Sequence, residues 1–372
     1  MSHNSVKQAS DAMFNDTPLN VLVCGTTFGR VYLKAIAALP EQFRLVGILA
    51  RGSEHSKAVA AEYDVPLYQQ LADLPEQGID CACVVVRAGV VGGPGAELAE
   101  GLLARGIAVL QEHPLHLNEI SRCLQAARQA GRPWVMNNFY PDVAPVARFI
   151  QLGRALRQHS RITSLDISAS VHVLYPLIEI LAQLLGGLRP WHFSEVLTHS
   201  GPFSLLSAEI AGVPVSLRIQ NQINPDDPDN HTELLHRISL ASEAGILLLT
   251  DTHGSVQWQP RLHVPRNGQG QLTMFERDQS ALQSAVQEIA AATPVPDYGQ
   301  LFNQLWPKAM QRALLRFAAQ LHSGDLQPAR QQATLATCQC WQVLGQALGP
   351  TETIHPDVPV SLSLAELEAY IS

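Results

Sequence analysis

The stretch LNVLVCGTTFGRVYL, residues 19–33, decides the fold of this chain. Its apolar first part, residues 19–24, predicts a buried strand, and the apolar positions that recur from Val31 onward predict a helix over residues 30–39. The turn between them, GTTFG, has a glycine at each end, and glycine lets a backbone bend sharply and approach a ligand closely. A strand, a tight turn and a helix in this order are typical of the first unit of a dinucleotide-binding domain.

The pattern of this first unit repeats outward along the chain. Further strands are expected at residues 45–50, 80–86, 107–111 and 134–138, and helices at 53–63, 96–105 and 117–130. Strands that alternate with helices form a parallel sheet with helices on both faces. We therefore predict an α/β fold whose residues 19–142 form a doubly wound, parallel Rossmann domain, preceded by a loose N-terminal extension, residues 1–18.

The regular alternation of strands and helices ends after Pro141. Strand-like runs follow one another without helices between them, at residues 162–173, 193–198, 207–210, 215–222, 236–241, 246–250 and 255–259. Neighbouring strands of this kind form a mixed or antiparallel sheet. Helices are expected at residues 143–156, 174–185, 305–322 and 328–348. We predict an α+β domain over residues 143–372 that carries the substrate site and the dimer contacts and ends in a helical tail.

Composition and charge exclude several classes of protein. The chain has 372 residues, a net charge of -8 and no basic run, which disfavours nucleic acid as a partner. Residues 1–18 lack the apolar core of a signal peptide, and no later run is long and apolar enough for a membrane span. The six cysteines include no Cys-x-x-Cys pair, so we expect reduced thiols, no metal site and a cytoplasmic protein. The acidic run NPDDPD, residues 224–229, contains two prolines and is interpreted as a solvated turn.

The ends of the first two strands indicate the cofactor. The turn GTTFG is one residue shorter than the usual G-x-G-x-x-G pattern, but it stands where a helix N-terminus meets a pyrophosphate. NAD-binding proteins usually place an acidic residue after the second strand, where this chain has Arg51 and Ser53. A guanidinium pairs with a 2′-phosphate that a carboxylate would repel, so these residues favour NADP(H).

Two further strand ends are expected to face the nicotinamide, because ligands bind at the carboxyl ends of strands in such sheets. One is Arg87 with its glycine-rich turn, and the other is Glu112-His113-Pro114, where Glu112 either holds the ribose or orients His113. Tyr140 ends the following strand and could reach the same crevice. The predicted cofactor-binding residues are Gly25, Thr26, Thr27, Phe28, Gly29, Arg51, Ser53, Ser56, Arg87, Gly93 and Glu112.

The strand and turn of residues 21–30, the Glu112-His113-Pro114 strand end and the two-domain layout resemble the glucose-fructose oxidoreductase / inositol dehydrogenase / MocA superfamily. Most sugar dehydrogenases of that superfamily carry Glu-Lys-Pro at this strand end, and the lysine helps to move a proton at a sugar hydroxyl. His113 stands in the place of that lysine, which disfavours sugar oxidation.

A narrower resemblance covers most of the chain after residue 18. It rests on VLVCGTTFGRVYL (21–33), VGILARGS (46–53), QEHPLH (111–116), NNFYP (137–141), GGLRPW (186–191) and NPDDPDNH (224–231), which look like thiazolinyl imine reductases of siderophore biosynthesis, as for pyochelin and yersiniabactin. The resemblance implies NADPH-dependent reduction of a thiazoline C=N bond to a thiazolidine, on an intermediate tethered to a nonribosomal peptide synthetase carrier domain. It also implies that His113 and Tyr140 are the general acids, and the wider superfamily implies a homodimer.

Several alternatives stay open on the sequence alone. Either His113 or Tyr140 could deliver the proton, or a water molecule could do so while both residues orient it. Each also has a purely structural reading, as a histidine packed beside Pro114 and as a tyrosine wedged by Pro141. For the whole chain, the alternatives are an NADP-dependent sugar or cyclitol dehydrogenase and a non-catalytic NADP-binding regulator.

Overall fold

The computed structural model describes residues 17–89, 92–275, 282–290 and 295–371. Six parallel strands form the first sheet, in the order β3-β2-β1-β4-β5-β6. They are β1 (Leu19–Cys24), β2 (Phe43–Leu49), β3 (Leu67–Tyr68), β4 (Cys81–Val84), β5 (Ala108–Glu112) and β6 (Trp134–Asn137). This order confirms the predicted doubly wound Rossmann sheet, and the winding reverses between β1 and β4, where such sheets bind their ligands.

Helices cover both faces of this sheet, as predicted. They are α2 (Gly29–Ala37), α3 (Glu54–Glu62), α4 (Gly95–Ala104) and α5 (Leu117–Ala130). Helix α2 buries Leu33 and Ile36, two of the apolar positions that predicted it, and also Tyr32, which was not part of that pattern. Strand β3 was not predicted, because its two residues are too few to show an alternation of apolar and polar positions.

Nine strands form the second sheet, in the order β16-β15-β14-β13-β7-β11-β10-β8, and β9 pairs with the start of β10 on the same edge as β8. They are β7 (Ile162–Ser170), β8 (Trp191–Phe193), β9 (Thr198–Ser200), β10 (Phe203–Ile210), β11 (Val213–Gln220), β13 (His236–Ser242), β14 (Gly245–Leu249), β15 (Val256–Pro260) and β16 (Glu288–Ile289). The β7–β11 pair is parallel and the other pairs are antiparallel, so the predicted mixed sheet is confirmed. The predicted strand at 193–198 is wrong, since residues 194–197 separate β8 from β9.

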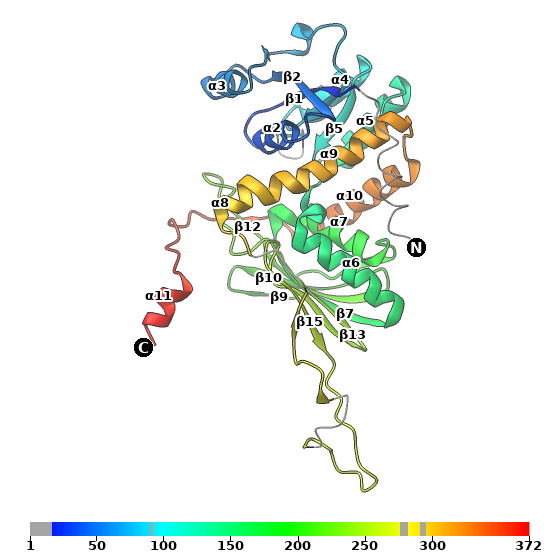
Figure 1. Ribbon diagram of the computed structural model, residues 1–372, viewed down its shortest axis with the longest axis vertical. Coiled ribbons are helices and arrows are strands. Elements are labelled where there is room, and N and C mark those ends of the chain that lie inside the picture. Colours follow the sequence, from blue (N-terminus) through cyan, green and yellow to red (C-terminus); the bar gives the residue numbers. More distant parts are fainter. Residues whose placement is uncertain (1–16, 90–91, 276–281, 291–294, 372) are drawn as a thin grey trace.

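Helices α6 (Ala144–His159) and α7 (Leu174–Leu185) cover one face of the second sheet and lie between it and the first domain (Figure 1). Alternate residues of the central strand β7, such as Leu165 and Ile167, are buried beneath them. One continuous cluster of buried apolar residues runs from the first sheet to the second. The two domains therefore share a hydrophobic core.

The C-terminal helices return to the first domain. Helix α9 (Trp306–Ser323) follows a short helix, α8 (Tyr298–Gln300), and a π-helical turn, η6 (Leu301–Leu305), and packs on α2. Helix α10 (Pro328–Leu348) packs on both α5 and α7. Beyond it, β17 (Glu352–Thr353) pairs with β12 (Gln222–Ile223), and α11 (Leu364–Ala369) ends the described chain.

Two sequence expectations concern the chain as a whole. None of the helices within the described ranges is both long and apolar enough to cross a membrane. All six cysteines are buried free thiols. Most of the predicted N-terminal extension, residues 1–16, lies outside the described residues.

Candidate active site

The turn after β1 is clamped against the end of β4. Gly25 has a φ of +94°, and a Cβ atom at this position would lie 2.4 Å from the carbonyl oxygen of Val85. Only glycine accepts both constraints, which explains the first residue of the GTTFG turn. Helix α2 begins four residues later without a side-chain cap, so its N-terminus is suited to hold an anionic ligand such as a pyrophosphate.

The second loop of the predicted cofactor site lies beside this turn. Arg51 and Ser53 are exposed there, as expected of residues that contact a ligand. Ser56 is completely buried, and its hydroxyl donates to the carbonyl oxygen of Ser53 at 2.8 Å, so Ser56 supports the loop from within. His55 Nε2 lies 3.2 Å from the carbonyl oxygen of the buried Thr26, a tie between the two loops that sequence reasoning missed.

A third loop follows β4 and contains the exposed Arg87. Gly93 packs so tightly that a Cβ atom there would lie 2.1 Å from the carbonyl oxygen of Arg87, which explains the glycine. Glu119 anchors the loop, because its Oε1 accepts the backbone N–H of Gly89 at 2.9 Å. A groove of about 530 Å³ opens beside this anchor, between the start of α5 and α10. Residues 90–91 lie outside the described chain.

His113 stands at the carboxyl end of β5, before a cis peptide bond to Pro114. Its Nδ1 lies 3.1 Å from Glu112 Oε1 and 3.1 Å from the carbonyl oxygen of Asn137. Both neighbours only accept hydrogen bonds, so Nδ1 carries a hydrogen and Nε2 is the nitrogen that gains or loses a proton. The imidazole also stacks on Tyr175, with ring centroids 5.4 Å apart.

The surroundings of His113 favour its charged form. Burial by itself lowers the pKa of His113, but the hydrogen bond and negative charge of Glu112, with smaller effects of the Asn137 carbonyl and Glu179, raise it above its usual value. The side chain is still 10% exposed, so it can meet a ligand. His113 is therefore poised to donate a proton from Nε2 near neutral pH.

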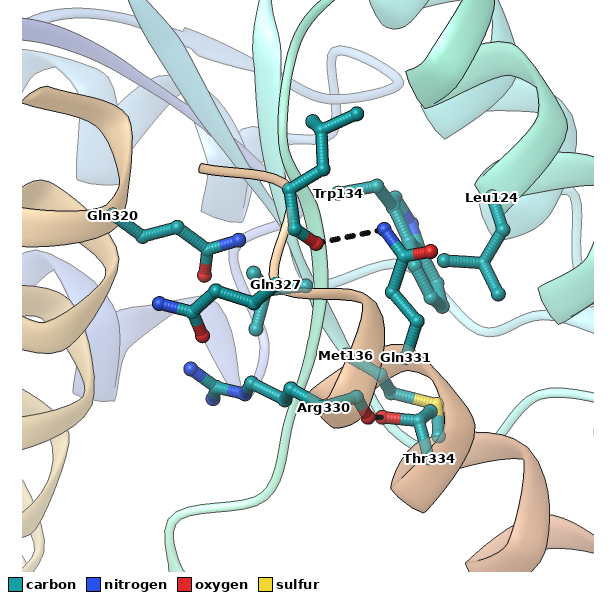
Figure 2. A pocket seen from close by; sticks show the side chains of 10 residues that line it. Leu124, Trp134, Met136, Gln320, Gln327, Arg330, Gln331 and Thr334 are labelled. Atoms are coloured by element: carbon teal, nitrogen blue, oxygen red, sulfur yellow. Dashed lines mark hydrogen bonds between the residues drawn. The ribbon is translucent and has the colours of Figure 1, made fainter. Parts of the chain in front are cut away.

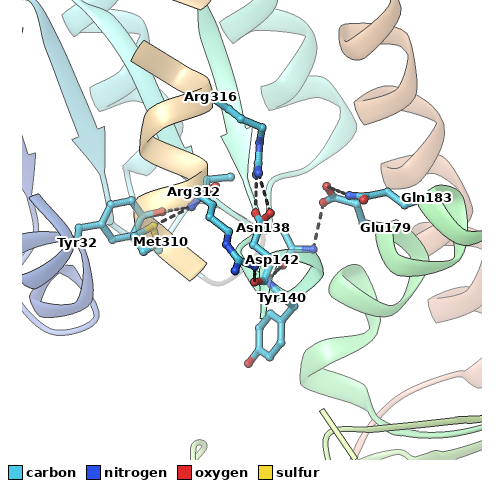
Figure 3. A network of polar contacts seen from close by, with 10 residues as sticks. Tyr32, Asn138, Tyr140, Asp142, Glu179, Gln183, Met310, Arg312 and Arg316 are labelled. Carbon is cyan, nitrogen blue, oxygen red and sulfur yellow. Dashed lines mark hydrogen bonds and ion pairs between the residues drawn. The ribbon is translucent and has the colours of Figure 1, made fainter. Parts of the chain in front are cut away.

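Tyr140 lies in the short 3-10 turn η3 (Tyr140–Asp142) that follows β6. Its ring stands edge-on to that of His113, with centroids 6.5 Å apart, so the structure brings together the two residues that were predicted to converge. Burial, and then the charges of Glu112 and Asp229, raise the pKa of the Tyr140 hydroxyl well above its usual value. The hydroxyl keeps its proton and points away from the polar network around it (Figure 3).

That polar network holds the Tyr140 turn in place (Figure 3). Asn138 accepts the backbone N–H of Tyr140 at 3.2 Å and donates to Glu179 on α7 at 3.1 Å. Arg316 of α9 forms a two-point ion pair with Asp142. Helices from the second domain and from the C-terminal tail thus fix the position of the Tyr140 ring.

An aromatic wall, formed by Phe28, Phe139, Tyr140 and Trp306, joins the cofactor turn to the Tyr140 turn. Phe28 lies 5.8 Å from Phe139 and 6.0 Å from Trp306, measured between ring centroids. Trp306 Nε1 donates to His253 Nε2 at 3.0 Å, which ties the wall to the second sheet. Sequence reasoning found Phe28 and Tyr140 but missed Trp306, although a tryptophan before the N-terminal proline of a helix was a visible signal.

A buried imidazole of the second domain, His236, faces the other side of Tyr140. The ring of His236 meets Tyr140 edge-on at 5.5 Å, and its two nitrogens bond Thr252 Oγ1 and the carbonyl oxygen of Val173, each at 2.9 Å. Burial lowers the pKa of His236 to about 4. The site thus combines His236, whose pKa is lowered, with His113, whose pKa is raised. Sequence reasoning missed His236, which reads as an ordinary strand residue.

The acidic run of the second domain lies in exposed chain beyond this imidazole. Asp226 pairs with His355 at 2.8 Å, and Asn230 donates to Asp227 at 2.9 Å. Within the described ranges, no three His, Cys, Asp or Glu side chains gather closely enough to hold a metal ion.

The small cavity of Figure 2 lies away from these residues, between β6, α5 and the loop that joins α9 to α10. Its volume is about 10 Å³, which is room for roughly one water molecule. Gln320 lines it and has a buried Oε1 atom without a hydrogen-bond partner, which such a water would satisfy. We interpret this cavity as a structural water site.

Comparisons with known proteins agree with this geometry. A family model described as the oxidoreductase family with an NAD-binding Rossmann fold, GFO/IDH/MocA, matches residues 19–139. A second model, for the C-terminal domain of thiazolinyl imine reductase Irp3-like proteins, matches residues 160–259. No curated protein sequence is significantly similar to the chain.

Several solved structures share the fold. KijD10, a 3-ketoreductase from Actinomadura kijaniata in complex with TDP-benzene and NADP, is 16% identical, with 91% of this chain and 100% of that chain covered and a TM-score of 0.63. An oxidoreductase from Agrobacterium radiobacter in complex with NAD+, L-tartaric acid and magnesium is 12% identical, with coverages of 88% and 95% and a TM-score of 0.62. At these identities the likeness shows the fold alone.

The buried His236 predicts how stability depends on pH. Its pKa of about 4 in the folded chain lies below the ordinary 6.5, so between these values the unfolded chain binds a proton that the folded chain does not. The free energy of unfolding therefore falls as the pH falls through this window, by up to ~1.4 kcal/mol per pH unit from this residue. We expect His236→Gln to remove that part of the slope in urea unfolding, whereas His159→Gln, at an exposed position, leaves it unchanged. An equal slope in wild type and His236→Gln would contradict the prediction.

Proposed function

The chain belongs to the GFO/IDH/MocA family of NAD(P)-binding oxidoreductases, with an Irp3-like C-terminal domain, and we propose that it is an NADPH-dependent thiazolinyl imine reductase. It reduces the C=N bond of a thiazoline to a thiazolidine in nonribosomal siderophore biosynthesis of the pyochelin or yersiniabactin type. The observation that carries the proposal is the pairing of two proton donors, His113 and Tyr140, at the carboxyl ends of neighbouring strands of the first sheet.

The residues of this chain suit the chemistry of imine reduction. When bound, NADPH supplies the hydride that is added to the imine carbon. His113 donates its Nε2 proton to the imine nitrogen, which makes the carbon more electrophilic and yields a neutral amine. Tyr140 is the second donor for the same nitrogen lone pair when His113 is neutral, and the charge of Glu112 favours the charged form of His113. The aromatic wall excludes water from the reacting atoms.

The cofactor preference rests on the loop after β2. Arg51 and Ser53 are exposed beside the cofactor turn, and no acidic residue stands at positions 50–53. A guanidinium there binds the 2′-phosphate of NADP(H). Thr26, Thr27, Phe28 and Gly29 would hold the pyrophosphate, with Arg87 and Gly93 on the opposite loop.

The partners proposed for the chain are a carrier domain, which tethers the thiazoline, and a second copy of the chain. Exposed apolar side chains support the homodimer: Leu262 is 82% exposed, Phe275 90%, Val286 92% and Ile371 87%. Apolar residues this exposed commonly mark protein contacts. The buried free thiols support a cytoplasmic, reducing compartment. Light scattering that gives the mass of a monomer would contradict the homodimer.

Turnover of a synthetic substrate tests the function directly. With an aryl-thiazolinyl-thiazoline ester, we expect loss of reduced-nicotinamide absorbance and formation of the thiazolidine, with NADPH preferred over NADH. Sugars and cyclitols with NADP+ serve as the competing substrates. Turnover of a sugar and none of the thiazoline, free or carrier-bound, would replace the proposal with the dehydrogenase alternative.

Removal of either proton donor should slow the chemical step. We expect His113→Ala to lower kcat by ~10²-fold or more and Tyr140→Phe to lower it less, because general acids contribute about 10²–10⁴-fold. The dissociation constant of NADPH should stay near that of wild type in both variants. A double variant with normal turnover would remove both residues from the proton-donor role.

Removal of Arg51 should weaken the preference for NADPH. We expect Arg51→Ala to reduce the ratio of kcat/KM for NADPH to that for NADH by ~10-fold or more, as the loss of one charged hydrogen-bonded contact implies. Arg44→Ala is the matched control, because Arg44 is also exposed but lies at the opposite end of β2. The same ratio in Arg51→Ala and wild type would show that other residues recognise the 2′-phosphate.

A further inference from the structure

A continuous chain of buried polar groups runs beneath His113. Asn137 Nδ2 donates to the hydroxyl oxygen of Tyr32 at 2.7 Å, and the Tyr32 hydroxyl in turn donates to Glu112 Oε2. Glu112 Oε1 lies 3.1 Å from Nδ1 of His113. The direction of the chain is fixed, because an amide N–H can only donate and the hydroxyl proton must then go to the carboxylate.

Tyr32 has no other polar role in the described structure. Its side chain is completely buried on the face of α2 that packs on the first sheet, three residues after the cofactor turn. The groups that face it are Glu112, the Asn137 amide and the buried thiol of Cys83. A phenylalanine would fill the same space, so packing alone does not explain the hydroxyl.

Glu112 is the carboxylate in direct contact with His113. The other groups that face the imidazole are the carbonyl oxygen of Asn137, the rings of Tyr140 and Tyr175, and, through its charge, Glu179 of α7. Whatever holds the Glu112 carboxylate in place therefore affects the charge of His113.

We propose that Tyr32 is a positioning residue, whose hydroxyl holds Glu112 as a carboxylate directed at Nδ1 and so keeps the proton on His113; this rests on the proposed role of His113 as the acid. Without the hydroxyl, Glu112 Oε2 would face a phenyl ring. A buried carboxylate that lacks a donor favours its neutral form. Because the hydrogen bond and the charge of Glu112 raise the pKa of His113, a carboxylate that is no longer held at Nδ1 would leave the imidazole with a lower pKa.

The test compares four forms of the full-length chain without added cofactor: wild type, Tyr32→Phe, Glu112→Gln and Tyr68→Phe. NMR titration of the imidazole nitrogens reports the charge of His113, with its signal assigned by a His113→Gln variant. Tyr32→Phe keeps the ring, so a merely structural role leaves the titration unchanged. Tyr68→Phe is the matched control, because Tyr68 is a half-buried tyrosine of the same domain whose hydroxyl bonds no residue of the described chain.

The expected result is a shift in one direction. Glu112→Gln and Tyr32→Phe should both lower the pH at which His113 loses its charge, by ~1 pH unit or more, which is a tenfold change in its ionisation constant. Tyr68→Phe should titrate as wild type does. If His113 titrates in Tyr32→Phe as it does in wild type, the proposal is overturned. The same result in Glu112→Gln also overturns it, so the proposal can be tested even if Tyr32→Phe does not fold.

Kinetics separate this proposal from the proposed function. With the thiazoline ester and NADPH, Tyr32→Phe should lower kcat by ~10-fold at neutral pH, move the alkaline limb of the pH profile to lower pH and leave the KM for NADPH unchanged. If wild type reduces no thiazoline, the proposed function is contradicted, and the NMR titration alone still decides whether Tyr32 controls the charge of His113.

Discussion

A carboxylate buried at the junction of the two domains is the constraint on which the site depends. Glu112 is only 13% exposed, and an ionised group costs several kcal/mol to bury unless hydrogen-bond donors surround it. Its donors come from separate elements, since Tyr32 lies on α2 and His113 follows β5. The hydroxyl of Tyr32 is itself held by Asn137 of β6. The need to satisfy one charge therefore fixes how α2, β5 and β6 meet.

The C-terminal helix α9 completes the site from the other end of the sequence. Trp306 belongs to the aromatic wall, and Met310, one turn further along, brings its sulfur within 3.3 Å of the Asn137 amide. Positions four apart lie on one face of a helix, so both side chains point toward the junction. Arg316 then holds the Tyr140 turn through Asp142 (Figure 3). The match to the Rossmann family model ends at residue 139, so it does not include these residues of α9, which position the ends of the strands of the first sheet.

Most helices and strands, and part of the candidate site, could be predicted from the sequence, and the reason differs from one element to the next. The helices 117–130, 174–185 and 328–348 were predicted with the bounds that the structure shows, because each has clear caps or glycine ends. Strand β10 was predicted to begin four residues late, since both of its first two residues are buried and show no alternation. His113 and Tyr140 could be paired because they follow strands that were expected to be neighbours.

Other site residues could not be found in this way. Tyr32 and Glu112 are 80 positions apart, and Trp306 and His253 are 53 apart, so no local pattern relates them. A buried tyrosine on an apolar helix face looks the same in sequence whether its hydroxyl holds a carboxylate or a water. Ser56, in contrast, was predicted to bind the cofactor, but its side chain is buried and its hydroxyl bonds a carbonyl oxygen of its own loop.

For the imine reduction that we propose, a histidine beside Glu112 is a suitable acid. A proton donor works best when its pKa lies near the working pH, and an ammonium group in the same place would hold its proton too tightly to give it up readily. A buried imidazole without a neighbouring carboxylate would hold its proton too weakly, because burial alone lowers its pKa, as it does at His236. The negative charge of Glu112 offsets that cost at His113, where the pKa is raised instead. One carboxylate thereby raises the pKa of His113, while burial lowers that of His236 at the same junction, so His113 is the histidine suited to protonate the imine nitrogen in the proposed reaction.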